Sequence, residues 1–293
     1  MKILKQEYFK GERALFKGEN LRVEDSVFGD GESPLKESQH IQINQSIFKW
    51  KYPLWYSNDI FVENSTLLET ARSGIWYTHN ITIKDSMIEA PKTLRRSSHI
   101  QLENVDMPLA LETLWNCHDI ELKNVSARGD YFGMNSQDLK IEKLNLTGNY
   151  CFDGVKNIEV HHSKLISKDA FWNCENVVVY DSVIIGEYLG WNSKNVTFIN
   201  CTIESLQGLC YIENLKLVNC KLINTTLAFE YSTVDADIVS CIDSVMNPLS
   251  GVIKAYGIGE LVLDETKINP QDTEITICKP HIHQQETIQC VCS

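Results

Sequence analysis

Apolar and polar residues alternate in short segments that recur along the chain every 19 to 21 residues. In one such segment, DIFVENSTL at 59–67, Ile60 and Val62 flank Phe61. A two-residue period predicts a short β-strand with one buried face. The first apolar position of successive segments is occupied by Ile41, Ile60, Ile81, Ile100, Ile120, Leu139, Ile158, Val177, Val196 and Leu215.

Such short strands cannot bury their apolar faces alone, so the repeat predicts strands stacked in successive rungs. Asn and Asp recur directly before the first apolar position and four residues after it, and both tolerate the left-handed backbone of tight corners. Small residues recur five positions after it, as at Ser46, Ser65 and Ser86, and suit an inward corner. We therefore expect an all-β protein, a single-stranded right-handed parallel β-helix (solenoid) of about 11–12 rungs of 19–21 residues.

Other repeat folds fit this pattern less well. A leucine-rich repeat would have a Leu-dominated consensus, and a pentapeptide-repeat helix would have a strict five-residue spacing. The expected organisation is one domain with four segments. Residues 1–20 form an N-terminal cap, 21–245 the β-helix, 246–275 an irregular C-terminal cap with a last strand near 260–263, and 276–293 a disordered tail.

Composition narrows the possible partners. The formal net charge of -12 argues against direct contact with nucleic acid, which requires a basic surface. The N-terminal residues lack the apolar stretch of a secretory signal, and no window approaches the roughly 20 apolar residues of a membrane span. We therefore expect a cytoplasmic protein without membrane contact, in which the ten cysteines are free thiols. Monomer and dimer both remain open.

Several longer motifs resemble a known family. They are GERALF at 11–16, DGESPLKES at 30–38, FKWKYPLWYS at 48–57, ETARSGIWYT at 69–78, EAPKTLRRSS at 89–98 and LTGNYCFDG at 146–154. They resemble a bacterial family of unknown function, numbered 3737, over about residues 6–270. The resemblance implies a β-helix fold and no assigned activity.

The second half of each rung carries three columns that could form a binding face. One column contains Trp55, Trp76, Arg95 and Trp115, and the next position contains Tyr56, Tyr77, Arg96, Asn116 and Asn135. The third column, three residues before the tryptophans, includes Lys92, Glu112 and Tyr131. Small residues follow the Tyr/Asn column and suit an inward corner, so that column should face outward. The tryptophan column could face outward or fill the core, and simple stacking of like residues is the structural alternative.

These columns predict a face that binds, and could process, an oligosaccharide or another anionic chain-like ligand. Its residues are Tyr56, Tyr77, Lys92, Arg95, Arg96, Trp115, Asn116, Tyr131 and Asn135. Glu112 and Asp130, at nearly matching positions of consecutive rungs, are candidates for the carboxylate pair that hydrolysis would need, although a Lys92–Glu112 surface ion pair is the structural alternative. The competing hypothesis is a non-catalytic scaffold that docks a protein partner through exposed aromatic residues.

We assign no cofactor and no metal site from the sequence. Cys278, His281, His283, Cys290 and Cys292 lie close together near the C-terminus, but their spacing matches no known metal motif. The pair His161–His162 at a strand end is expected to face solvent. A nucleic-acid mimic is disfavoured because the acidic residues are scattered among Lys and Arg.

Overall fold

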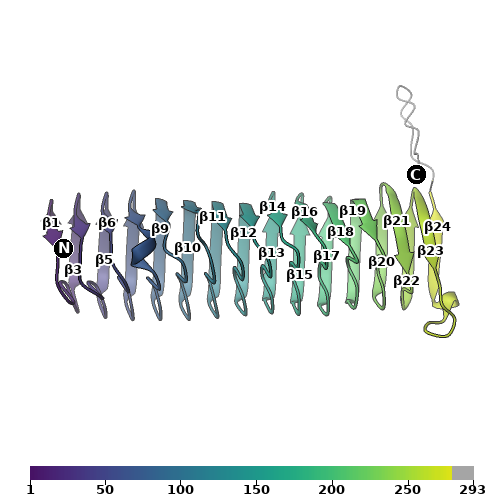
Figure 1. Ribbon diagram of the computed structural model, residues 1–293, viewed down its shortest axis with the longest axis horizontal. Coiled ribbons are helices and arrows are strands. Elements are labelled where there is room, and N and C mark those ends of the chain that lie inside the picture. The colour runs from purple at the N-terminus through teal and green to yellow at the C-terminus, as the bar shows by residue number, and fades with distance from the viewer. Residues whose placement is uncertain (279–293) are drawn as a thin grey trace, which may run out of the picture. The chain divides into compact units, whose positions relative to one another are not determined.

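The computed structural model describes residues 1–278, so His281, His283, Cys290 and Cys292 and most of the expected tail lie outside the described residues. The chain divides into two compact units, Met1–Ile158 and Glu159–Ser293. Within each unit, parallel strands are stacked rung upon rung, as expected for a β-solenoid (Figure 1). Among residues 1–278 no helix has the length and apolar character needed to cross a membrane.

The first unit contains one long strand per rung and, in its early rungs, a short second strand. The long strands are β1 (Lys2–Lys5), β3 (Glu19–Glu24), β5 (Gln39–Asn44), β7 (Asn58–Glu63), β9 (His79–Ile88), β10 (Ser98–Met107), β11 (His118–Arg128) and β12 (Gln137–Thr147). The short strands are β2 (Tyr8–Phe9), β4 (Val27–Phe28), β6 (Ile47–Phe48) and β8 (Thr66–Leu67), and a 3-10 turn, η1, covers Glu69–Ala71.

The register of the first unit confirms the periodicity. Ile41 pairs with Ile60, Ile60 with Ile81, and Ile81 with Ile100, each on parallel strands. The same column continues through Ile120 to Leu139. All of these residues are buried, because the first apolar position of every rung faces the core.

The second unit follows the same plan. After β13 (Lys156–His161), its strands are β14 (Lys164–Ile166), β15 (Glu175–Tyr180), β16 (Val183–Gly186), β17 (Lys194–Ile199), β18 (Thr202–Leu206), β19 (Glu213–Thr226), β20 (Thr233–Ile238), β21 (Cys241–Met246), β22 (Ser250–Ala255), β23 (Gly257–Val262) and β24 (Thr273–Ile277), with a 3-10 turn, η2, at Pro270–Asp272. Val177, Val196, Leu215 and Val234 form its in-register apolar column.

The described residues form about 15 turns, more than the expected 11–12. The additional turns come from the two segments that we expected to be caps. Residues 1–20 contain β1 and β2, which pair in parallel with β3 and β4. Beyond residue 245, β22 pairs with β20, β24 pairs with β22, and β23 pairs with β21. These segments extend the stacking, and their role as caps stays a prediction.

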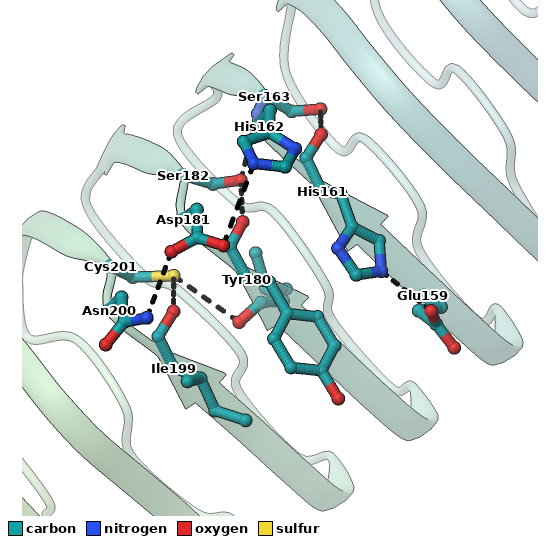
Figure 2. Close-up of polar contacts among 11 residues, drawn as sticks. Glu159, His161, His162, Ser163, Tyr180, Asp181, Ser182, Ile199, Asn200 and Cys201 are labelled. Atoms are coloured by element: carbon teal, nitrogen blue, oxygen red, sulfur yellow. Dashed lines mark hydrogen bonds and ion pairs between the residues drawn. The ribbon is translucent and has the colours of Figure 1, made fainter.

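The corners are held by side chains in ladders. In the first unit Ser46 N–H donates to Ser65 Oγ at 3.0 Å, and Ser46 Oγ donates to the Asn44 carbonyl at 2.9 Å, so the small inward residues satisfy the buried backbone. In the second unit the Asn200 amide donates to Asp181 at 3.0 Å, and Cys201 Sγ donates to the Ile199 carbonyl at 3.3 Å (Figure 2). The eight cysteines among residues 1–278 are free thiols.

Candidate binding face

The tryptophan column of the first unit lies on the outer surface, which answers the question that the sequence left open. Trp55, Trp76 and Trp115 are all half-buried. The Trp76 indole N–H donates to the Lys92 carbonyl at 2.8 Å, and the Trp115 indole N–H donates to the Tyr131 carbonyl at 2.6 Å. Each indole therefore bonds to the backbone of the following rung. The rings of Trp55 and Trp76 stack at 5.2 Å with an interplanar angle of 9°.

Arg95 takes the place of a tryptophan in this column. It forms parallel bridges with Trp76 and with Trp115, and its guanidinium carbon lies 5.2 Å and 4.3 Å from their ring centroids. Its Nε–H donates to the Glu112 carbonyl at 3.2 Å, just as each indole N–H donates to the next rung. A guanidinium is planar and carries N–H donors, so it preserves both the stacking and the hydrogen bond of the column.

Glu112 is held between two cations. Its carboxylate accepts a short hydrogen bond from Arg95 and lies 3.3 Å from Lys92 Nζ. Partial burial acts to raise the pKa of this carboxyl, but the hydrogen bonds and charges of Arg95 and Lys92 outweigh burial and lower the pKa below its ordinary value. A general acid for glycoside hydrolysis needs a raised pKa. Glu112 is therefore suited to an ion pair, and poorly suited to proton donation.

Asp130 lies on the rung next to Glu112, as the spacing predicted. The Glu112 N–H donates to the Asp130 carbonyl at 2.9 Å, and the Asp130 carboxylate accepts the Asn149 N–H at 2.8 Å. The Asp130 carboxylate thus supports a turn of the backbone. Both candidate catalytic carboxylates have structural partners, and no feature of either favours catalysis.

The Tyr/Asn column faces outward as expected, but its ring faces are covered. Tyr56 and Tyr77 stack at 4.7 Å with an interplanar angle of 2°. Lys36 Nζ lies 5.5 Å from the Tyr56 ring centroid, and the Arg96 guanidinium carbon lies 5.7 Å from that of Tyr77. The four side chains form one continuous stack over consecutive rungs. Only ring edges and hydroxyls reach solvent, so a sugar cannot lie flat on Tyr56 or Tyr77.

Arg96 is an exposed cation of this face without a carboxylate partner among residues 1–278. Arg96 and Lys92 are both exposed, but Arg96 differs in that its Nη1 donates to the Tyr77 hydroxyl at 2.9 Å and that it forms no ion pair within the described part of the chain. Lys92 and Arg95 share the Glu112 carboxylate. Three cations and one carboxylate leave two positive charges on this part of a chain whose formal net charge is -12.

The remaining residues of the face are polar and follow the corners. Asn116 and Asn135 are exposed and have positive φ values of 52° and 53°. Asparagine tolerates this left-handed backbone conformation better than most residues, which explains its place at these corners. Tyr131 stacks on Tyr150 at 4.9 Å. The structure therefore brings all nine predicted residues to the outer surface of the first unit, where most of them stabilise the rungs as well.

Two hollows lie elsewhere on the first unit, and the sequence did not reveal them. A hollow of about 290 Å³ is lined by Met1, Asn20, His40, Ile41, Gln42, Asp59 and Phe61. A second, of about 230 Å³, is lined by Arg22, Gln42, Ile43, Asn44, Phe61 and Glu63. The feature of the sequence that could have indicated the hollows is Phe61, a large aromatic residue at an outward strand position between buried Ile60 and Val62. Its neighbours in register are the smaller or more flexible Gln42 and Thr82.

The histidine pair of the second unit is built into surface contacts. The His161 ring stacks on Tyr180 at 4.5 Å, and its Nε2 lies 2.7 Å from Glu159 (Figure 2). His162 is exposed, as expected, with its Nε2 3.8 Å from Asp181. His161 is only half-exposed because the tyrosine covers one face of its ring.

Parallel rungs, polar corner ladders and an outer aromatic column together define a β-solenoid protein. The chain belongs to the family described as "Protein of unknown function (DUF3737)", whose profile matches residues 2–276. No curated protein matches the sequence significantly.

Solved structures with a similar chain path include two kinds of protein. PfbA, a surface adhesin of Streptococcus pneumoniae, has 9% identity and a TM-score of 0.44 over 88% of this chain and 81% of that chain. The A-module of the mannuronan C-5 epimerase AlgE4 from Azotobacter vinelandii has 8% identity and a TM-score of 0.28 over 95% of this chain and 89% of that chain. At these values no functional argument follows from either.

Proposed function

We propose that this protein binds an anionic chain-like ligand, of the class of uronic-acid oligosaccharides, on the face that contains Arg96. The observation that carries the proposal is the exposed Arg96 guanidinium, which Tyr77 holds in place through its ring and its hydroxyl. A guanidinium that is already oriented loses little conformational freedom on binding, and its planar set of donors matches a carboxylate.

The neighbouring groups favour recognition of a polymer over a single anion. Lys92, four residues before Arg96 in the same rung, adds positive charge, although its ion pair with Glu112 neutralises part of that charge. Asn116, Asn135 and the edge of Tyr131 supply amide and hydroxyl groups over the following rungs. Because rungs are spaced at about 4.8 Å, a chain of sugar rings could contact several of these groups in succession. The lowered pKa of Glu112 disfavours this residue as the general acid of hydrolysis, so the proposal is limited to binding.

The test is a titration with oligogalacturonate trimers, followed by intrinsic tryptophan fluorescence, because Trp76 and Trp115 lie beside the proposed ligand. Arg96→Gln should weaken binding at least tenfold, which corresponds to about 1.4 kcal/mol. The matched control is Arg128→Gln, another exposed arginine of the first unit, at the end of β11. Binding should also weaken as salt rises. Absence of saturable binding, or an equal effect of both variants, would refute the proposal.

A protein-docking scaffold is the second candidate, and one observation favours it. Tyr56, Leu111 and Tyr131 expose 48%, 37% and 36% of their surface on the first unit, which is typical of interface anchors. Under this hypothesis Leu111→Ser and Tyr131→Ala would weaken binding of a protein partner in a quantitative pull-down. Oligogalacturonate would then bind neither the parent protein nor the variants.

A further inference from the structure

The two hollows of the first unit lie side by side on the outer side of the sheet and share two lining side chains. Both are lined by Gln42 of β5 and by Phe61 of β7, so they meet at these two side chains. Ile41 lines one hollow and Ile43 the other, which places the groove along the direction of β5. We call this surface the Phe61 groove. It contains none of the residues of the Arg96 face.

Phe61 gives the groove an aromatic wall. Its side chain is half-exposed and, within residues 1–278, it has no aromatic or cationic stacking partner, whereas Tyr56 and Tyr77 stack on one another. The face of a phenyl ring carries negative charge density and attracts the weakly positive C–H groups of a pyranose. Because Phe61 lines both hollows and is half-exposed, part of its ring can contact a sugar bound there.

A fixed polar pair lies at one end of the groove. His40 Nδ1 lies 2.5 Å from Asp59 Oδ2, and the Asn80 amide donates to the other Asp59 oxygen at 3.0 Å. The Asp59 carboxylate is thereby held from both sides. The amides of Asn20 and Gln42 line the same hollow, and each offers donors and an acceptor side by side, as neighbouring sugar hydroxyls require.

The charge of the groove favours a neutral ligand. Two positive groups belong to the lining residues: the Arg22 guanidinium, whose Nε lies 2.6 Å from Glu24, and the α-amino group of Met1. Asp59 and Glu63 add negative charge to the lining. Two positive and two negative groups leave this lining without an excess of positive charge that would attract a uronic acid, whereas its amides can hydrogen-bond to neutral sugar hydroxyls.

We infer that the Phe61 groove binds a neutral disaccharide unit, one ring in each hollow, with Phe61 and Gln42 at the junction. Hollows of about 290 and 230 Å³ lie near and below the lower limit of ordinary ligand sites, so each is suited to a single sugar ring. This site is independent of the Arg96 face, because the two differ in residues, in charge and in the ligand they select.

The test uses the full chain and three neutral probes, maltotriose, cellotriose and chitotriose, measured by isothermal titration calorimetry. At least one should bind, and Phe61→Ala should weaken its binding at least tenfold. Phe61→Trp should keep binding and add a fluorescence change on titration, which shows that the aromatic wall contacts the sugar. Thr82→Ala is the matched control, because Thr82 occupies the same column one rung further on and lines neither hollow.

Arg96→Gln separates this site from the proposed function. It should leave binding of the neutral sugar unchanged while it weakens oligogalacturonate binding. The inference is overturned if none of the three probes binds, if Phe61→Ala binds as tightly as the parent protein, or if Arg96→Gln abolishes binding of the neutral sugar.

Discussion

The guanidinium carbon of Arg95 lies 4.3 Å from the centroid of the Trp115 ring, closer than its 5.2 Å from the Trp76 ring on the other side. The cation thus fills a gap between two indoles and continues their column. Removing it leaves Trp76 and Trp115 each without a stacking partner on the side that faces Arg95, and Glu112 with a single cation.

Arg95→Ala should lower the free energy of unfolding by about 1–3 kcal/mol, from the lost cation–π contacts and ion pair. Arg95→Trp should recover most of the loss, because an indole at this position can stack and donate to the Glu112 carbonyl. Urea unfolding followed by tryptophan fluorescence measures both. Equal midpoints for Arg95→Ala and the parent protein would contradict this account of the column.

Glu112 should make stability depend on pH in the acidic range. Its folded pKa lies below the ordinary value of 4.5, so its ion pairs stabilise the folded chain above pH 4.5, and this contribution is lost as pH falls through the lowered pKa. Glu112→Gln should be less stable than the parent protein at pH 7, and the difference should shrink as the pH falls below 4.5 and through the lowered pKa. Thermal unfolding between pH 3 and 7 tests this, with the exposed Glu121→Gln as the control. A stability difference that grows on acidification would contradict the ion pair.

The Cys117 thiol should be unreactive toward alkylating reagents in the folded protein. Burial raises the pKa of its thiol to about 12, and the side chain donates to the Leu94 carbonyl at 3.2 Å. Because the thiolate is the reactive form, Cys117 should resist iodoacetamide at pH 8 in the native state and react in urea, as followed by peptide mass spectrometry. Cys117→Ser should change the unfolding free energy by less than about 1 kcal/mol, since serines occupy the same corner on both adjacent rungs. Native labelling as fast as in urea would contradict the buried corner.

Gly31 and Gly11 form a matched pair for testing how closely adjacent rungs approach. Gly31 has a φ of +136°, and a Cβ there would lie 2.1 Å from the Gly11 carbonyl oxygen. Gly11 has a φ of +89° with no atom within 4 Å of its Cβ position. Gly11→Ala should therefore cost about 1–2 kcal/mol from backbone strain alone, and Gly31→Ala should cost clearly more. Melting temperatures from circular dichroism compare them, and equal losses would show that the rungs can separate at little cost.

The repeat was predictable because every rung buries the same apolar positions against the preceding and following rungs. Ile60, Ile81 and Ile100 stack in register as their spacing indicated, and the small corner residues Ser65 and Ser97 are buried. The orientation of Trp76 was not predictable, because it depends on a hydrogen bond from its indole to Lys92 of the next rung, and an indole is equally able to fill a core.

The candidate sites were harder to predict than the fold. Binding residues were predicted at positions where aromatic residues repeat, such as Tyr56 and Tyr77. In the structure these two rings stack on one another, so the repetition itself covers one face of each ring. Phe61 was not predicted as a binding residue, because its neighbours in the column, Gln42 and Thr82, are not aromatic. These two residues flank it in register, and a single rung carries no information about that difference between rungs.

The corner ladders give the stack a direction. Asn124 donates to Asn104, and Asn104 donates to Asp85, each toward the preceding rung; likewise Asn219 donates to Asn200, and Asn200 to Asp181. An ionised aspartate can only accept, so it ends a run that each asparagine can extend. A duplicated or deleted rung inside a run of asparagines would preserve every amide bond of the ladder. Such runs are therefore the natural places for the chain to have grown or shortened by whole repeats during its evolution.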